Sequence, residues 1–270
     1  MFGTIKSGMA TSMFEISVVS NNIANAGTNA FRKSSASFSD LYTGASAESV
    51  SRLSLGVGSV VEKSRQSAEQ GGLMEQDGVL NLALVGNGMF VSKAPDGSNG
   101  DNPRSQLLTF TRDGELSLDK NGLLRTSTND LVLGYDGVGG TELRQLRVPF
   151  QSLDGSTLTA LEIDDSGIIN ATYGSEEPMM LGQIAVGAFP NGTALRQLGT
   201  GRFQASAEAG ELMLGVSGQD GFGQIKTGVL EASNVNLTTE LTSMIRAQQQ
   251  FSGSSRMLQA YSDMVEKLIR

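Results

Sequence analysis

The stretch Met1–Ala26 reads MFGTIKSGMATSMFEISVVSNNIANA, and apolar side chains recur along it at steps of three or four residues. The apolar set is Phe2, Ile5, Met9, Met13, Ile16, Val19 and Ile23. This spacing places the set on one stripe of a helix, and its mean of about three and a half residues is typical of a coiled-coil seam. Because a lone amphipathic helix is marginal in water, the stripe predicts a partner.

The other end of the chain, Asn236–Arg270, repeats the same pattern. Its apolar set is Leu237, Leu241, Met244, Phe251, Leu258, Tyr261, Val265 and Leu268. A stripe at helical spacing is more often an ordinary core face than an oligomer seam. Here the stripes are narrow, and the opposite faces carry Ser, Thr, Gln and Asn rather than dense charge. We therefore expect the two helices to pair and to form subunit interfaces along these fifteen residues.

Everything between the two helices is typical of β structure. Glycine accounts for 34 of the 270 residues, while only five are proline, which indicates many tight turns. Asn121-Gly122 lies between two strand-like runs and is a strong hairpin signal. Asp164 to Gly167 forms a similar turn sequence, while the small, polar stretch Gly44–Ser54 is the expected hinge.

These patterns predict an α+β fold. Paired, coiled-coil-like N- and C-terminal helices flank a predominantly antiparallel β region of one or two subdomains. The expected domains are a terminal helical assembly domain (1–35 and 232–270), an extended strap and hinge (36–75) and a β-rich outer region (76–231), with a candidate subdivision near 137–158.

Composition excludes several function classes. The net charge of −8 argues against nucleic-acid binding and against adhesion to anionic membranes. Without cysteine or histidine, the chain lacks thiolate and imidazole metal ligands and the commonest general base. We therefore expect no enzyme activity, no catalytic residue, no cofactor and no metal. No apolar run is long enough for a membrane span, so no membrane insertion is expected.

Two kinds of local sequence could suggest a ligand site but are better explained as turns. Gly56-Val57-Gly58 and Gly86-Asn87-Gly88 lack the full glycine pattern of a phosphate-binding loop, so turns and β-bulges are expected there. Asp119 and Asp164 lack the spacing of a calcium loop, and an aspartate that bonds its own backbone in a hairpin turn explains each of them.

A set of short motifs resembles the bacterial flagellar axial proteins, the rod and hook family. Asn21-Asn22-Ile23-Ala24-Asn25, followed by Phe31 and Arg32, is similar to the family's N-terminal signature, although Ala30 stands where the family usually has Gly. Ser233-Asn234-Val235 is similar to the lead into its last helix. LVGNGMF at 84–90 and FTRDG at 110–114 resemble its β motifs. The motifs extend over nearly the whole chain in the family's order.

The resemblance implies a structural subunit that self-assembles into a tubular helical polymer, which transmits torque and conducts exported subunits. A hook-like member is favoured, with a distal or proximal rod protein as the alternative. Its implied partners are further copies of itself, neighbouring axial proteins, the flagellar type III export machinery and an assembly cap. The implied location is the flagellar basal body or hook, reached without a cleaved signal peptide. A different class also fits the residues: a β-rich binding module on a discrete oligomeric helical stalk.

Overall fold

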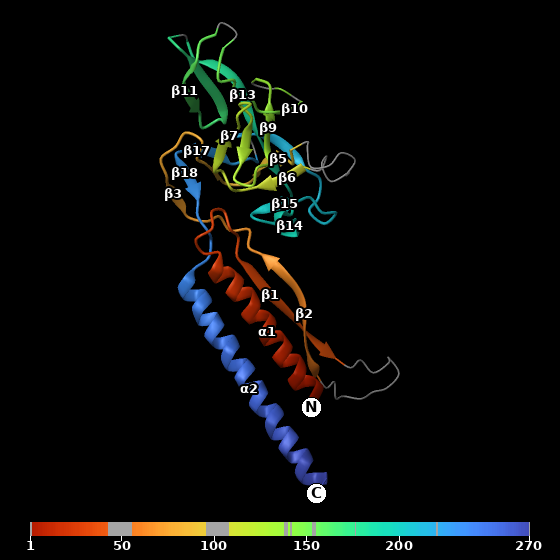
Figure 1. Cartoon of the computed structure of the whole chain (residues 1–270). Helices are drawn as coiled ribbons and strands as arrows, with labels where there is room; N and C mark the ends of the chain where they lie inside the picture. Colours follow the sequence, from red (N-terminus) through yellow and green to blue (C-terminus); the bar gives the residue numbers. More distant parts are fainter. Residues whose placement is uncertain are drawn as a thin grey trace. The chain divides into compact units, whose positions relative to one another are not determined.

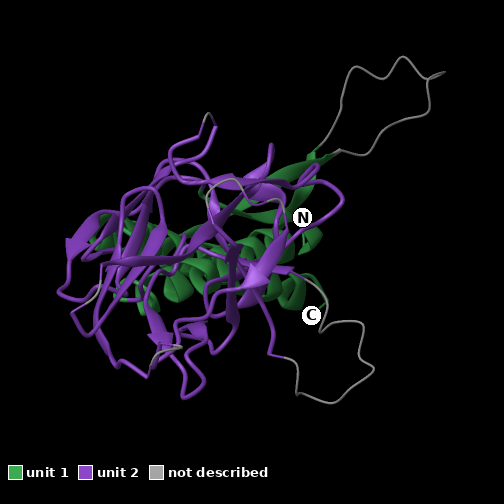
Figure 2. Cartoon of the chain, turned by 90° about the horizontal axis from the view of Figure 1, so that it is seen from above, with its two compact units in different colours: residues 1–27, 33–67, 235–270 green, residues 28–32, 68–234 purple. Residues whose placement is uncertain are grey.

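The computed structural model describes residues 2–42, 56–95, 108–137, 140, 142–152, 155–175, 177–219 and 221–269. Contacts divide the chain into two compact units (Figure 2): unit 1 comprises residues 1–27, 33–67 and 235–270, and unit 2 comprises residues 28–32 and 68–234. Both α-helices belong to unit 1 and most strands to unit 2, which confirms the α+β class. The hinge predicted at Gly44–Ser54 lies outside the described residues.

Unit 1 is built from two helices and one hairpin (Figure 1): α1 (Phe2–Ala24), α2 (Leu237–Ile269), β1 (Ser34–Tyr42) and β2 (Gly56–Gln66). Helix α1 contacts both α2 and the hairpin. The terminal helices therefore pack together, while a coiled-coil geometry for their packing stays a prediction.

Local chemistry explains where the helices begin and end. Asn236 caps α2, because its Oδ1 accepts a hydrogen bond from Thr239 N at 3.2 Å. Helix α1 ends in a turn in which Asn25 N donates to Asn21 O. The left-handed residue after this turn is Ala30, with φ of 54°, whereas Gly27 does not have a positive φ.

The segment predicted as a strap is a β-hairpin over its described part. Strands β1 and β2 pair antiparallel with two register shifts, of which the second lies between Leu41 and Tyr42, opposite Gly58 and Gly56. The glycine pair therefore lies at a β-bulge, as expected. Residues 33–67 group with the helices and residues 68–75 with unit 2, so the strap is not a separate domain.

Unit 2 is a β structure in which every described strand pair is antiparallel. Its elements are β3 (Leu73–Glu75), β4 (Leu82–Val85), β5 (Met89–Lys93), β6 (Leu108–Thr111), β7 (Leu116–Leu118), β8 (Leu124–Thr126), β9 (Leu131–Tyr135), β10 (Leu143–Gln145), β11 (Leu158–Ile163), β12 (Ile168–Tyr173), β13 (Met179–Ala188), η2 (Gly192–Ala194), β14 (Arg196–Gly199), β15 (Arg202–Gln204), β16 (Met213–Val216), β17 (Gln224–Thr227) and β18 (Val229–Glu231).

The main sheet of unit 2 follows the order β11-β12-β13-β9-β5-β6-β15-β14. Strands β7, β8, β10 and β16 join it off this path, while β17–β4 and β18–β3 form two smaller sheets. The candidate subdivision near 137–158 does not separate compact units, because the described residues of that stretch lie within unit 2.

Both predicted hairpins are confirmed. Strands β7 and β8 pair across the turn at Asp119–Gly122, where Gly122 has φ of 74°. Strands β11 and β12 pair across Asp164–Gly167, where Gly167 N donates to Asp164 O at 2.7 Å. The aspartates serve the turns, since the Asp119 and Asp164 carboxylates accept hydrogen bonds from the next backbone N–H.

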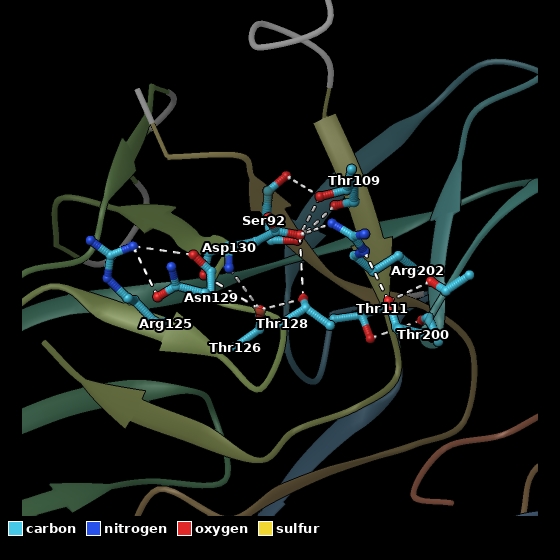
Figure 3. A network of polar contacts seen from close by, with 12 residues as sticks. Ser92, Thr109, Thr111, Arg125, Thr126, Thr128, Asn129, Asp130, Thr200 and Arg202 are labelled. Carbon is cyan, nitrogen blue, oxygen red and sulfur yellow. Dashed lines mark hydrogen bonds and ion pairs between the residues drawn. The ribbon is translucent and has the colours of Figure 1, made fainter. Parts of the chain in front are cut away.

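Apolar side chains of alternating strand positions fill two core clusters in unit 2, centred on Phe90 and on Phe110. A polar network also lies within the sheet (Figure 3). Ser92 and Thr109 pair across β5 and β6, and their hydroxyl oxygens are hydrogen-bonded to each other at 2.9 Å. Arg202 of β15 donates to the buried Asp130 carboxylate at 3.3 Å, which ties this strand to the turn before β9.

Candidate assembly surface

The inner face of the helix pair contains only part of the predicted seam. In α1, Val19 is buried and Ile5, Met9, Ile16 and Ile23 are half-buried. In α2, five seam residues are half-buried: Met244, Phe251, Leu258, Tyr261 and Val265. The remaining predicted seam residues are exposed: Phe2, Met13, Leu237, Leu241 and Leu268.

The protected positions of α2 follow a stricter spacing than its apolar residues do. The main series is Glu240, Met244, Ala247, Phe251, Ser254, Leu258, Tyr261 and Val265, with Glu240 and Ala247 buried, and the half-buried Ser243 and Ser255 lie beside it. The steps alternate between four and three residues, which keeps one face of α2 against its neighbour. The prediction missed Glu240, Ala247 and Ser254 because they are charged or small, although their spacing completes the repeat.

The two helices run antiparallel. Asn22, near the end of α1, bonds Glu240, near the start of α2. Gly8 lies so close to α2 that an added Cβ would be 3.6 Å from Ser254 Oγ. Phe2 lies beside Leu258, Tyr261 and Val265. Small residues such as Gly8 therefore allow the two helix backbones to approach.

A buried asparagine fastens three elements of unit 1. Asn22 is only 1% exposed, and its Nδ2 donates to Glu240 Oε2 at 3.0 Å and to Ser34 O at 2.8 Å. Its Oδ1 accepts from Ser34 N at 2.9 Å. One side chain thus joins α1, α2 and the start of β1. The neighbouring Asn21 is exposed, so the two adjacent asparagines have different roles.

The hairpin approaches α1 through small side chains. Ser59 N donates to Ser7 Oγ at 3.3 Å, and Thr4 Oγ1 donates to Val57 O at 3.4 Å. Gly58 has φ of 131°, and a Cβ added there would be 2.2 Å from Ser7 Oγ. The serines and threonines along α1 therefore hold the edge of β2 at short range.

Helix α2 presents two outward apolar stripes. Leu237, Leu241 and Ile245 recur every four residues along its first turns and are each about half exposed, at 49%, 50% and 55%. Met257, Met264 and Leu268 form a second stripe at steps of seven and four residues. Ile245, Met257, Met264 and Ile269 were not predicted as seam residues. Contiguous exposed apolar side chains of this kind mark interaction surfaces.

The C-terminal end of α2 is strongly exposed to solvent. An apolar pocket of about 410 Å³ lies between Phe2 and the residues from Leu258 to Val265. Beyond it, Leu268 is 84% and Ile269 is 82% exposed. Helix α2 has 33 residues against 23 in α1, so its last turn extends past the start of the shorter helix.

The family-motif residues of unit 2 meet where the chain enters and leaves it. Asn234 N donates to Phe31 O at 3.2 Å, and Asn234 Nδ2 donates to Glu69 O at 2.9 Å. Phe31 is buried, and Ser233 and Asn234 are half-buried, as is Val235, the first residue of the last segment of unit 1. These contacts pair the incoming segment with the outgoing one.

Glu231 forms the charged centre of this crossing. Its Oε2 accepts from Arg112 Nη1 at 3.2 Å and its Oε1 from Gly71 N at 3.1 Å. Arg112 also donates to Leu84 O at 2.7 Å and to Gly86 O. Burial lowers the pKa of Arg112, while the adjacent Glu231 carboxylate raises it. Arg112 therefore joins the FTRDG and LVGNGMF motifs to the outgoing strand.

Two other observations concern the described residues only. Neither helix in the described ranges is long and apolar enough to cross a membrane. No group of three or more acidic side chains in that part of the chain is arranged to hold a metal ion.

Comparisons with known proteins identify the family. Residues 226–270 match the family described as "Flagellar basal body rod FlgEFG protein C-terminal". The flagellar basal-body rod protein FlgG of Buchnera aphidicola subsp. Acyrthosiphon pisum is 30% identical over 97% of this chain and 96% of its own length. That of Borreliella burgdorferi is 28% identical over 97% and 94%, respectively.

A hook protein is also similar, but over less sequence. The flagellar hook protein FlgE of Escherichia coli K12 is 26% identical over 70% of this chain and 42% of its own length. The preference for a hook-like member is therefore not supported, and the rod alternative fits the comparisons better. From its motifs and these full-length similarities, the chain belongs to the flagellar basal-body rod and hook family of axial structural proteins.

Proposed function

We propose that the chain is a structural subunit of the flagellar basal-body rod, not an enzyme. It self-assembles into a tubular helical polymer that transmits torque and conducts exported subunits. The observation that carries this proposal is the pair of outward apolar stripes on α2, in which every side chain is about half exposed or more. Full-length similarity to proteins named as rod proteins supports the assignment to the rod rather than to the hook.

The seam then has two faces. The face of α2 that includes Met244, Ala247 and Phe251 packs on α1 within one subunit, whereas Leu241 and its stripe pack on neighbouring subunits. A contact between two different surfaces that does not close on itself produces a filament rather than a ring. Further axial proteins at either end of the polymer, the type III export machinery and an assembly cap complete the proposed partners.

The terminal helices become fully ordered only on assembly. An isolated helix pair whose outward apolar stripes remain in water gains little from folding, and a neighbour supplies the missing burial. Circular dichroism of monomer and polymer tests this step. We expect less helix in the monomer, and equal helicity in both states contradicts coupled ordering.

Electron microscopy of the purified full chain tests the proposal. We expect straight tubes. Curved tubes would instead support the hook-like member, and a discrete closed particle would support the binding module on an oligomeric stalk. A chain that stays monomeric at all concentrations and ionic strengths contradicts self-assembly.

A further inference from the structure

Unit 2 contains a cavity of about 510 Å³ whose lining includes Arg32 and Arg112. Both arginines are more than nine-tenths buried, with 7% and 4% of their surface exposed. The Nε of each arginine lacks a hydrogen-bond acceptor among the described residues. Arg112 is already paired with Glu231, so Arg32 is the arginine of the two without an ionic partner among the described residues, and a buried guanidinium without one is costly.

The charges beside this cavity do not balance. Glu231 is the carboxylate that interacts electrostatically with both arginines. Its two oxygens are already used by Arg112 Nη1 and Gly71 N. No ion pair joins Arg32 to a carboxylate within the described residues. Because arginine stays protonated in proteins, the three side chains carry one net positive charge.

The rest of the cavity wall combines apolar and polar side chains. Met89, Phe189, Pro190, Leu195 and Met213 line it beside Asn87, Asn191 and Thr193, and Met213 is 50% exposed. A single net positive charge beside amide and hydroxyl groups suits a monoanion such as a carboxylate, whose organic part can contact the apolar residues. A phosphate dianion suits it less well, because its second charge would be repelled by the Glu231 carboxylate.

We propose that this cavity is a carboxylate-binding site, filled in the assembled polymer by an exposed acidic side chain of a second copy of the chain. Arginine offers a planar pair of donors that matches a carboxylate. The chain carries 28 acidic against 20 basic residues, so a second copy offers carboxylates that complement the net positive charge of this cavity. A cavity on one copy that receives a side chain from a different surface of the next is a contact that propagates along a polymer. The choice of occupant rests on the proposed self-assembly.

The site is tested first in the monomer, with benzoate as probe and benzamide as its uncharged control. The full chain is labelled with ¹³C at its methionine methyl groups and kept below the concentration at which it scatters light. We expect benzoate to shift the Met89 and Met213 signals with about millimolar affinity, and benzamide to leave them in place. Met9 and Met244, in unit 1, serve as internal controls. Absence of a benzoate-specific shift at Met89 and Met213 overturns the site.

Arg32→Gln tests the residue assignment. We expect it to weaken benzoate binding by about tenfold to a hundredfold, since a charge-assisted hydrogen bond is lost. The matched control is Arg144→Gln, which removes an exposed arginine of the same unit. Unchanged benzoate affinity in Arg32→Gln overturns the assignment. If this variant fails to fold, the comparison of benzoate with benzamide on the natural chain still decides the proposal.

A second arm tests the occupant. Saturating benzoate is expected to slow polymerisation of the natural chain, followed by light scattering, whereas benzamide is not. If benzoate binds but polymerisation proceeds at its normal rate, the proposal that a second copy of the chain fills the cavity is overturned. If the chain polymerises and benzoate does not bind, the cavity proposal fails and the proposed function stands. If benzoate binds and no polymer forms, the proposed function fails and only the carboxylate site remains.

Discussion

Replacing Asn22 with Ala tests the buried junction of unit 1. The substitution removes two neutral hydrogen bonds, to Ser34 O and from Ser34 N, and one to the Glu240 carboxylate. Neutral bonds contribute about 1 kcal/mol each, and a bond to a charged group contributes about 1.5–3 kcal/mol. The variant should therefore lose about 3–5 kcal/mol, because Asn22 is 1% exposed and water does not replace its bonds without rearrangement.

The assay is the critical concentration for polymerisation, measured by light scattering. If ordering of the helix pair is coupled to assembly, a loss of this size raises the critical concentration about a hundredfold to a few thousandfold. Asn21→Ala is the matched control, since it makes the same chemical change one residue earlier on an exposed side chain. We expect it to stay within about threefold of the natural chain. Equal critical concentrations for Asn22→Ala and Asn21→Ala would show that the hydrogen bonds of Asn22 do not stabilise the assembling helix pair.

Three further substitutions probe other contacts. Gly58→Ala should weaken docking of the β1–β2 hairpin on α1 and raise the rate at which a protease cleaves the hairpin, because φ is 131° and the new Cβ would lie 2.2 Å from Ser7 Oγ. Gly56→Ala, which has open space around it, should have neither effect. Arg112→Met should lower the stability of unit 2 by about 3–5 kcal/mol in thermal unfolding, since it leaves Glu231 buried without its partner, and a loss no larger than that of Arg144→Met would contradict this. Asp119→Asn should destabilise the β7–β8 hairpin at neutral pH. The hydrogen bond from Arg125 holds the pKa of the Asp119 carboxyl below its ordinary value of 3.8. The contribution of this carboxylate to stability is therefore present above 3.8 and is lost as pH falls through the lower pKa of the folded state. A stability difference from the natural chain that persists unchanged at lower pH would exclude this origin.

Periodicity and turn chemistry predicted the elements of this fold well. The apolar steps of three and four residues identified both helices, and Asn121-Gly122 identified a hairpin. These signals are local, so they survive in a single sequence. The conformation of Ala30 was not predicted, because alanine rarely adopts positive φ and its tertiary bond to Glu231 O supplies the constraint.

The division of the seam into inner and outer faces required the structure. Periodicity shows that Leu241 and Met244 are apolar, but not that one faces solvent while the other faces α1. Glu240 was missed because its partner Asn22 is 218 residues away in sequence. A buried polar pair of this kind interrupts an apolar pattern, and nothing local signals that it is satisfied. The choice between rod and hook depended on full-length similarity.

The outward stripe of α2 that contains Leu241 is the proposed subunit interface. Leu241→Asp places a charge on that stripe, while Thr242→Asp places the same charge one residue later at an exposed position off the stripe. A companion variant, Ile16→Asp, instead places a charge on the half-buried inner face of α1 and tests the packing of the helix pair. Polymerisation of the purified variants, followed by light scattering and electron microscopy, decides the claim. We predict that Leu241→Asp leaves unit 2 folded and forms no tubes, whereas Thr242→Asp assembles normally; tubes from Leu241→Asp at the concentration that suffices for the natural chain would contradict it.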